Sequence, residues 1–148
     1  AARDLEVPRY DVLQPHYNLY DRHEFEHDLA EICHEHELAV TPYFALASGF
    51  LTGKYRKHAD IAGTAREPFL GDYFDDRGMA ILDALDEVAN SHDTTPAAVA
   101  LAWLMARPTV TAPIVSATSN NQLNQLIAAT TLELDDTAMT RLDEASRG

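Results

Sequence analysis

Three short stretches with strand propensity, separated by helical patterns, limit what this chain can form. They lie near residues 10–14, 38–43 and 110–115, and helical patterns fill much of the sequence between and after them. Alternating strands and helices predict a parallel sheet. A parallel sheet of three strands has two open edges and apolar faces that are hard to cover. The pattern therefore predicts an α/β chain that is part of a larger structure.

Apolar side chains at helical spacing predict about five helices around this sheet. The first lies in "RHEFEHDLAEICHEHE", and its expected apolar face carries Phe25, Leu29, Ile32 and Cys33. On the opposite face, His23 and His27 have the i, i+4 spacing of a zinc-binding pair, with His34 on the same side. Glutamates share that face, so we interpret it as solvated rather than as a metal site.

Capping residues mark the later helices. Thr95 is a suitable N-cap, and Pro96 suits the first helical position. Ser119 precedes "NNQLNQLIAAT", with Gln122 three residues later as in a capping box. The last helix is capped by Asp135 or Asp136. Core positions expected from the spacing are Ile81, Leu82, Leu85, Val88, Ala89 and Trp103.

Composition excludes several classes of function. The 148 residues suffice for one domain, and the net charge of −13 repels nucleic acid and anionic membranes. No apolar run approaches the roughly 20 residues that cross a bilayer. Cys33 is the only cysteine, so no internal disulfide forms, which fits a cytoplasmic protein. The start "AARDLEVPRY" has no initiator Met and does not read as a signal peptide, so a processed or partial chain is expected.

The stretch "TPYFALASGFLTGKYR", residues 41–56, is either a phosphate-binding loop or an ordinary connection between a strand and a helix. It passes through small residues and ends on Lys54 and Arg56. Small residues let a ligand approach the backbone closely. Residues 52–78 show no sustained period and are predicted to form a long loop, which inside a compact domain is usually functional.

The order of these elements and several motifs resemble the C-terminal part of an aldo-keto reductase, over nearly the whole chain. "VLQPHYNLYDR" is similar to that family's sixth barrel strand, and "VTPYFALASGFLTGKYR" to its seventh strand and cofactor loop. "VALAWLMARPTVTAPIVSATSNNQL" resembles the helix, eighth strand and phosphate-binding turn, and "LELDDTAMTRLDEAS" the closing helix. The resemblance implies strands six to eight of a (β/α)₈ TIM barrel.

The family reduces carbonyls to alcohols with NADPH, sometimes NADH. Its catalytic Asp, Tyr, Lys and His come from the first four or so strands, so none of the four can be assigned in this chain. The resemblance thus implies much of a cofactor site without the complete catalytic machinery. The substrate cannot be deduced, because loops absent from this sequence form much of the pocket.

The resemblance places Gln14 and Tyr43 at the nicotinamide. Gln14 would hydrogen-bond the carboxamide, since a buried amide needs a partner; its alternative role is a polar strand end. Tyr43 would stack on the nicotinamide ring; its alternative role is a core tyrosine at the rim.

The loop of residues 44–49 resembles the family's pyrophosphate loop, in which backbone N–H groups and small side chains contact the phosphates. It includes Phe44, Ala45, Leu46, Ala47, Ser48 and Gly49. Many relatives have Ser-Pro where this chain has Phe44 and Ala45, so a hydroxyl is missing here. Lys54 is either a phosphate partner or a solvated surface lysine.

Ser116, Thr118 and Ser119 precede a helix, and helix N-termini attract anions. The family binds the adenosine 2′-phosphate of NADPH near this turn, often with an Arg or Lys. "SATSNNQ" contains neither, so the choice between NADPH and NADH stays open. Gln122 would contact adenosine, although its capping role explains it equally. Gln125 stands where many relatives have a Glu at the adenine.

Three hypotheses follow. The chain is the cofactor-binding part of a reductase whose N-terminal half supplies catalysis on a small carbonyl substrate. Alternatively, it is a non-catalytic half-barrel that acts as a homo-oligomer through its open sheet edges, or as a regulatory subunit like the family's ion-channel β subunits. The third hypothesis is a fragment with no function of its own, motivated by the missing Met.

Overall fold

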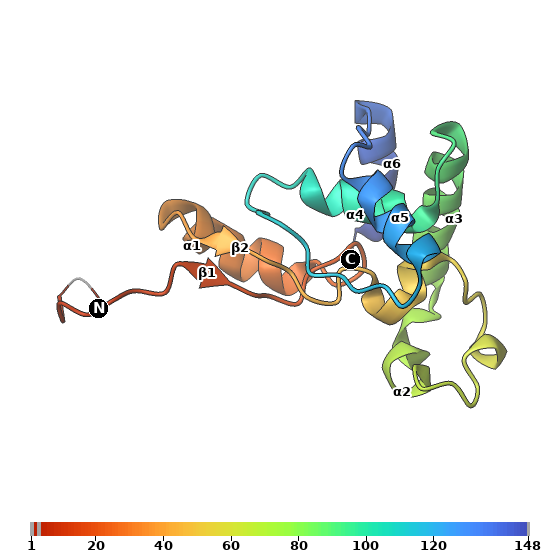
Figure 1. Cartoon of the computed structure of the whole chain (residues 1–148), viewed down its shortest axis with the longest axis horizontal. Coiled ribbons are helices and arrows are strands. Elements are labelled where there is room, and N and C mark those ends of the chain that lie inside the picture. Colours follow the sequence, from red (N-terminus) through yellow and green to blue (C-terminus); the bar gives the residue numbers. More distant parts are fainter. Residues whose placement is uncertain (1, 3, 148) are drawn as a thin grey trace.

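The computed structural model describes residue 2 and residues 4–147, and shows a small parallel sheet beside a group of helices (Figure 1). The sheet contains β1 (Val12–Leu13) and β2 (Ala39–Val40). A π-helical turn (Phe25–Leu29) and α1 (Ala30–Glu35) connect them. The remaining helices are α2 (Glu67–Leu70), α3 (Asp76–Ser91), α4 (Pro96–Met105), α5 (Asn120–Ala129) and α6 (Asp136–Ser146).

The two strands pair in parallel, with Val12 opposite Ala39 and Leu13 opposite Val40. The ladder continues beyond the assigned strands, since Thr41 N donates to Leu13 O (2.9 Å) and Tyr43 N donates to Pro15 O (3.0 Å). Pairing thus covers most of the ranges 10–14 and 38–43 that the sequence indicated. This arrangement is a small parallel α/β layer.

The expected third strand, residues 110–115, is present only as an irregular extended segment beside β2. Val110 forms a parallel bridge with Val40, and Ile114 N donates to Pro42 O (2.8 Å). Thr111 N and Ala112 N both approach the same acceptor, Val40 O, at 2.8 and 3.4 Å. One extra residue therefore interrupts the ladder, and Pro113 has no N–H to continue it. The prediction of three regular strands was wrong at this point, although the segment lies where the third strand was expected.

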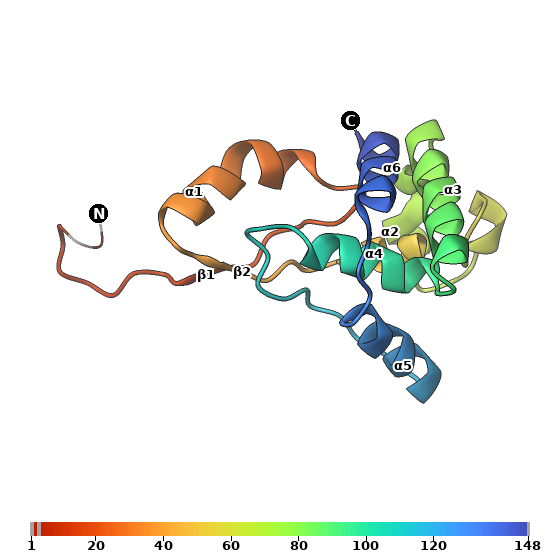
Figure 2. The same ribbon diagram turned by 90° about the horizontal axis from the view of Figure 1, so that it is seen from above.

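Helix packing forms the core. α3 packs against both α4 and α6, and α4 also packs against α5 (Figures 1 and 2). Every side chain from residue 97 to 104 on α4 is buried, including Trp103. The predicted inward face of α3 is confirmed, since all of its members are buried: Ile81, Leu82, Leu85, Val88 and Ala89.

Side-chain caps set where these helices begin. Asp75, Thr95, Ser119 and Asp135 each accept a hydrogen bond from the backbone N–H three residues later. The caps at Thr95 and Ser119 are as predicted, and Asp135 rather than Asp136 caps α6. The loop expected over residues 52–78 is shorter than predicted, because α3 already begins at Asp76. That loop also contains α2 and two 3₁₀ turns, His58–Asp60 and Gly71–Tyr73.

The first helix departs from the expected face at one residue. Phe25 and Cys33 are buried as predicted, but Ile32 is 48% exposed. The π-helical turn at Phe25–Leu29 explains this difference, because its wider turn shifts the positions that follow relative to an α-helix. The histidine face is exposed, and no cluster of three or more metal-ligating side chains occurs among the described residues.

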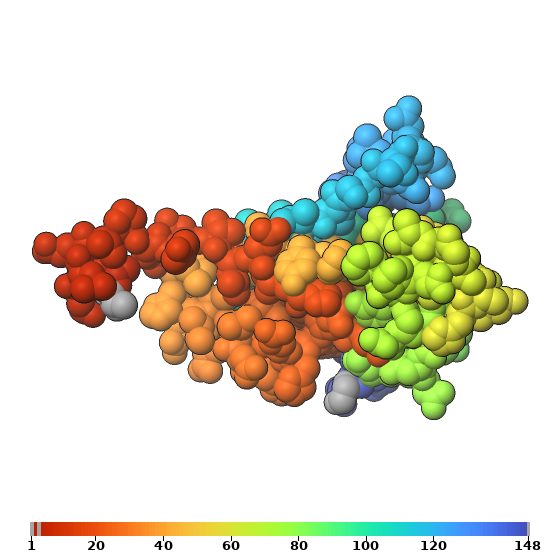
Figure 3. Space-filling model, turned by 90° about the horizontal axis from the view of Figure 1, so that it is seen from below, coloured from red at the N-terminus to blue at the C-terminus, as the bar shows by residue number. Residues whose placement is uncertain are grey.

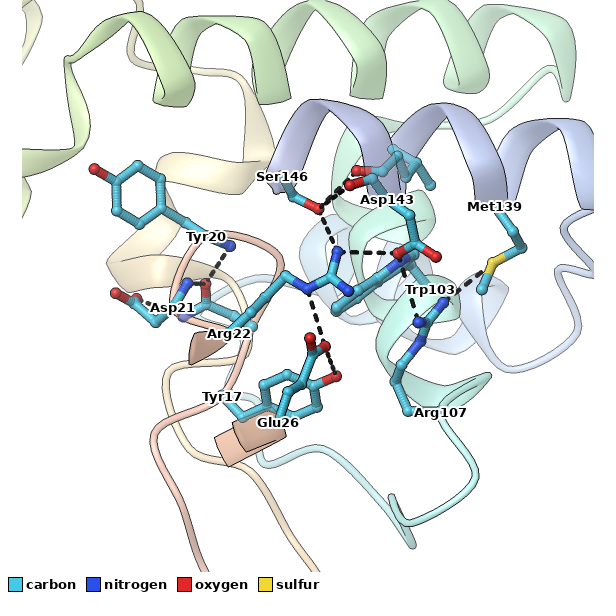
Figure 4. Close-up of polar contacts among 12 residues, drawn as sticks. Tyr17, Tyr20, Asp21, Arg22, Glu26, Trp103, Arg107, Met139, Asp143 and Ser146 are labelled. Carbon is cyan, nitrogen blue, oxygen red and sulfur yellow. Dashed lines mark hydrogen bonds and ion pairs between the residues drawn. The ribbon is translucent and has the colours of Figure 1, made fainter. Parts of the chain in front are cut away.

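A polar network joins the loop after β1 to α4 and α6 (Figure 4). Asp143 on α6 accepts hydrogen bonds from Trp103 Nε1 (2.9 Å) and from Arg22 (3.0 Å). The guanidinium of Arg107 lies 3.5 Å from the same carboxylate oxygen. Arg22 also donates to Glu26. These contacts fix the loop after β1 against the helices.

Two parts of the molecule extend from the body. The N-terminal arm points away from the sheet, and α5 projects on another side (Figures 2 and 3). Exposed apolar side chains lie on the arm, on β1, on the segment beside β2 and on α5: Tyr10, Val12, Ile114, Val115, Leu123 and Ile127. Within the part of the chain that the structure describes, no helix is both long and apolar enough to cross a membrane.

Candidate functional site

Chain segments leave the sheet together at one end, because its pairings are parallel. The bridge between His16 and Tyr43 puts the chain after β1 beside the chain after β2. The hydrogen bond from Ile114 N to Pro42 O brings the segment that leads to Ser116 to the same end. The carboxyl ends of parallel strands are where α/β sheets build their ligand sites. The structure therefore places the exits toward Gln14, Tyr43 and Ser116 at one edge of the sheet.

The loop after β2 has an unusual backbone. Four residues within it have positive φ: Phe44 (52°), Ala47 (46°), Ser48 (54°) and Gly49 (99°). Each of the non-glycine residues costs about 1–2 kcal/mol in this region. Strain of this kind persists where surrounding structure enforces it, and Phe50 and Leu51, both fully buried, anchor the loop. The core thus holds this strained loop in place, and contact of the loop with a phosphate stays a prediction.

Lys54 lies against this loop. A Cβ added at Gly49 would be 3.3 Å from Lys54 Cε and 3.4 Å from Lys54 Nζ, so the lysine covers the glycine. The ammonium also lies 4.7 Å from the centre of the Tyr55 ring. Arg56 turns away and forms an ion pair with Asp86 on α3 at 2.8 Å. Of the two cations that follow the loop, Lys54 is the one that contacts it.

The predicted nicotinamide residues lie on open surface. Tyr43 is 37% exposed and Phe44 is 43% exposed. Gln14 is exposed as well, so the argument that a buried amide needs a partner was wrong for this residue. β1 is an edge strand within the described residues, paired only with β2, and this leaves the end of the strand uncovered. Contact of Gln14 with a carboxamide stays a prediction.

The turn before α5 is organised by capping. Ser119 accepts from Gln122 N, while Gln122 Oε1 accepts from Thr118 N (2.8 Å) and Thr118 Oγ1 (3.0 Å). The reciprocal half of the expected capping box thus reaches Thr118 instead of Ser119. Ser116, Thr118 and Gln122 are exposed, and Gln125 is half-buried. No Lys or Arg occurs in the sequence from 108 to 140, so this turn offers an anion no cation of its own.

Sequence reasoning missed a polar cluster centred on Asp21, which adjoins this site. His16 Nε2 lies 3.0 Å from Asp21 Oδ2. The same oxygen accepts hydrogen bonds from Asn18 Nδ2 (2.9 Å) and from the Tyr73 hydroxyl (2.7 Å). Asn18 is fully buried and also donates to Phe44 O (3.0 Å). The cluster ties the loop after β1 to the loop after β2 and to the end of the long loop.

Burial and hydrogen bonding within this cluster shift the pKa values of its side chains. Burial raises the pKa of Asp21, but the hydrogen bonds from His16, Asn18 and Tyr73 outweigh it and hold that pKa below its usual value. The hydrogen bond to Asp21 raises the pKa of His16, and burial opposes that rise only in part. Burial and the hydrogen bond to Asp21 both raise the pKa of the Tyr73 hydroxyl, which remains a donor. Both shifts favour the charged forms, so His16 and Asp21 stabilise each other as an ion pair.

A signal for part of this cluster was present in the sequence. "QPHYNLYDR" has polar residues directly after a strand, where ligand and loop contacts concentrate. Tyr73 could not be found in this way, because it comes from a different loop 52 residues after Asp21.

Comparison with known proteins agrees with this geometry. The model of the Aldo/keto reductase family matches residues 2–147. The chain belongs to this family. A glycerol dehydrogenase from Gluconobacter oxydans superposes with a TM-score of 0.78 at 23% identity, covering 95% of this chain and 43% of that one. That likeness supports the barrel fold for this aldo/keto reductase chain.

Curated relatives of this aldo/keto reductase chain differ in the names they carry. A probable voltage-gated potassium channel subunit beta from Arabidopsis thaliana is 32% identical over 136 residues, which are 87% of this chain and 41% of that protein. The protein tas of Escherichia coli is 30% identical over 140 residues, covering 93% of this chain and 40% of that protein. The chain thus spans about two fifths of the length of these relatives.

Proposed function

We propose that this chain is the C-terminal, cofactor-binding part of an NAD(P)H-dependent aldo-keto reductase that reduces a carbonyl to an alcohol. The observation that carries the proposal is the strained loop after β2, with Lys54 lying over Gly49. The loop would offer Lys54 to a pyrophosphate at the carboxyl end of a parallel sheet, while the Ala47 and Gly49 N–H groups already donate to Phe44 O and Leu46 O. Because the chain has a net charge of −13, a local cation or backbone N–H groups must overcome the acidic background for an anion to bind.

The side chains around the loop are of the chemical types that bind a dinucleotide. Tyr43 offers a partly exposed aromatic ring for stacking, and Gln14 an exposed amide. The hydroxyls of Ser116 and Thr118 precede the N-terminus of α5, where an adenosine phosphate would be attracted. Bound NAD(P)H would supply the hydride, and the proton donor would come from barrel strands outside this chain.

Replacement of Lys54 tests the phosphate contact. Lys54→Ala is expected to weaken NADPH and NADH binding about fivefold, because it removes the cation beside the loop without disturbing a buried contact. The measurement is calorimetric titration of the full protein that carries this sequence. Lys57→Ala is the matched control, since Lys57 is an exposed lysine three residues away. Equal losses in both variants, or no dinucleotide binding to the unaltered protein, would contradict the proposed function.

A second function, association through the exposed sheet edge, rests on a different observation. Val12 is 54% exposed on β1 and Tyr10 is 91% exposed on the arm beside it, and a bare edge strand is prone to pairing. Some family relatives are named as potassium channel β subunits, which is consistent with a regulatory role. The edge would then pair with a second copy of the chain or with a partner's strand.

Sedimentation tests this alternative. If the chain self-associates through β1, it is expected to sediment as a dimer at concentrations of about 10 micromolar, and Val12→Lys is expected to shift it to monomer, since a charged side chain blocks edge pairing. Asp83→Lys, on the exposed face of α3, adds a lysine away from the edge and controls for charge. A stable monomer at this concentration would argue against the half-barrel.

A further inference from the structure

The Tyr43 ring contacts His16, a residue to which the proposed function assigns no role. The His16 and Tyr43 rings stack with centroids 5.3 Å apart and an interplanar angle of 22°. They come from paired positions at the ends of β1 and β2, so the stack is a cross-strand contact. The Phe44 ring meets His16 edge-on at 5.6 Å and 69°. One face of Tyr43 is therefore covered by an imidazole.

The imidazole is itself fixed from several directions. Its Nε2 pairs with Asp21 Oδ2, and that oxygen also binds Asn18 and Tyr73. Asn18 holds the carbonyl of Phe44, the residue next to Tyr43. Two loops that are distant in the sequence thus converge on Asp21, the partner of His16, and a rotation of the imidazole ring would break its contact with Asp21. This arrangement orients the ring more firmly than stacking alone.

We propose that His16 is a positioning residue for the nicotinamide end of the cofactor site. By stacking on one face of Tyr43, it sets the orientation of the phenol ring, and the opposite face receives the cofactor ring. The inference rests on the proposed function, because it needs a dinucleotide at Tyr43. It adds a role for a residue that touches neither phosphate nor carboxamide.

The charge of His16 makes this role depend on pH. The groups that face it are the carboxylates of Asp21 and Glu24, the phenol of Tyr43, and the side chains that share the adjoining hollow: Tyr20, Arg22, His23 and Arg77. The hydrogen bond to Asp21 raises the pKa of His16 above 6.5, so the ion pair is complete below 6.5 and is lost as pH rises through the raised value. Ordering of Tyr43 is expected to weaken over the same interval.

Titrations of the full protein with its reduced dinucleotide test whether His16 positions Tyr43. His16→Ala is expected to weaken binding about fivefold at about pH 6 and to remove the pH dependence, because an ordered aromatic stack is lost. His16→Phe keeps a stacking ring without the ion pair, so binding is expected to recover and to stay flat with pH. His34→Ala, an exposed histidine on α1, is the control. ADP-ribose, which has no nicotinamide, is expected to bind all four proteins alike.

Each result bears on a separate claim. If His16→Ala binds the reduced dinucleotide as tightly as the unaltered protein, or more tightly, then His16 does not position Tyr43 and the inference fails while the proposed function stands. Equal weakening of ADP-ribose would show a general loss of structure and would also overturn the inference. If the unaltered protein binds neither probe, the proposed function fails and the inference fails with it.

Discussion

Gly78→Ala is expected to lower the free energy of unfolding by about 3 kcal/mol, since overpacking against backbone costs at least this order. A Cβ added at Gly78, in the first turn of α3, would lie 1.8 Å from the carbonyl oxygen of Tyr73. Backbone cannot yield as a flexible side chain can, and the Phe50 ring stands 3.1 Å away on another side. Urea unfolding followed by circular dichroism measures the change.

The substitution Gly78→Ala is also expected to disturb the candidate site, because the same tight turn positions the Tyr73 hydroxyl beside Asp21. Gly78 N donates to Asp75 Oδ1, and the Tyr73 hydroxyl donates to Asp21 Oδ2 (2.7 Å). Gly71→Ala is the matched control, since nothing lies within 4 Å of a Cβ at that position. It is expected to be neutral or slightly stabilising. Equal stability of the two variants would contradict this account of the turn.

Asp143→Ala is expected to cost about 3 kcal/mol, because it removes the acceptor shared by Trp103, Arg22 and Arg107. The guanidinium groups of Arg22 and Arg107 both lie over the Trp103 ring, 4.9 and 4.4 Å from its centre. Without the carboxylate, those cations repel each other and the buried indole N–H has no partner (Figure 4). Chemical unfolding again supplies the measurement.

Two variants sharpen this test. Asp143→Asn keeps an acceptor for the indole but removes the charge, so about half of the loss is expected to return. Glu144→Ala, at the exposed neighbouring position on α6, is expected to change stability by about 0.5 kcal/mol or less. A loss in Glu144→Ala as large as that in Asp143→Ala would show that the effect comes from helix α6 in general.

The helices were predictable because their signals are local. Capping residues and apolar spacing identified the start of α4 at Pro96, the N-cap Ser119 and the inward face of α3 from the sequence alone. Two departures came from features without a local signature. A π-helical turn shifted Ile32 outward, and an extra residue beside Val40 broke the third strand.

The site was predictable only where residues follow one another in the chain. The small-residue loop after Tyr43 emerged from the resemblance, and its positive φ values at Phe44, Ala47 and Ser48 appear only in the structure. The Asp21 cluster could not be completed from the sequence because Tyr73 comes from a separate loop, 52 residues after Asp21, and spacing along the sequence says nothing of that contact. Gln14 was misjudged as buried for a similar reason, since burial depends on what covers the edge of the sheet.

Isotope-labelled NMR of the full protein, with and without NADPH, tests the central claim that the loop after β2 holds the cofactor. The account predicts that saturating NADPH shifts the backbone amides of residues 43–49 and of Lys54, together with those of residues 116–122. Amides on α6 and on the outer face of α3 would stay unchanged and serve as internal controls. Binding without shifts in residues 43–49, or shifts confined to other surfaces, would contradict the account.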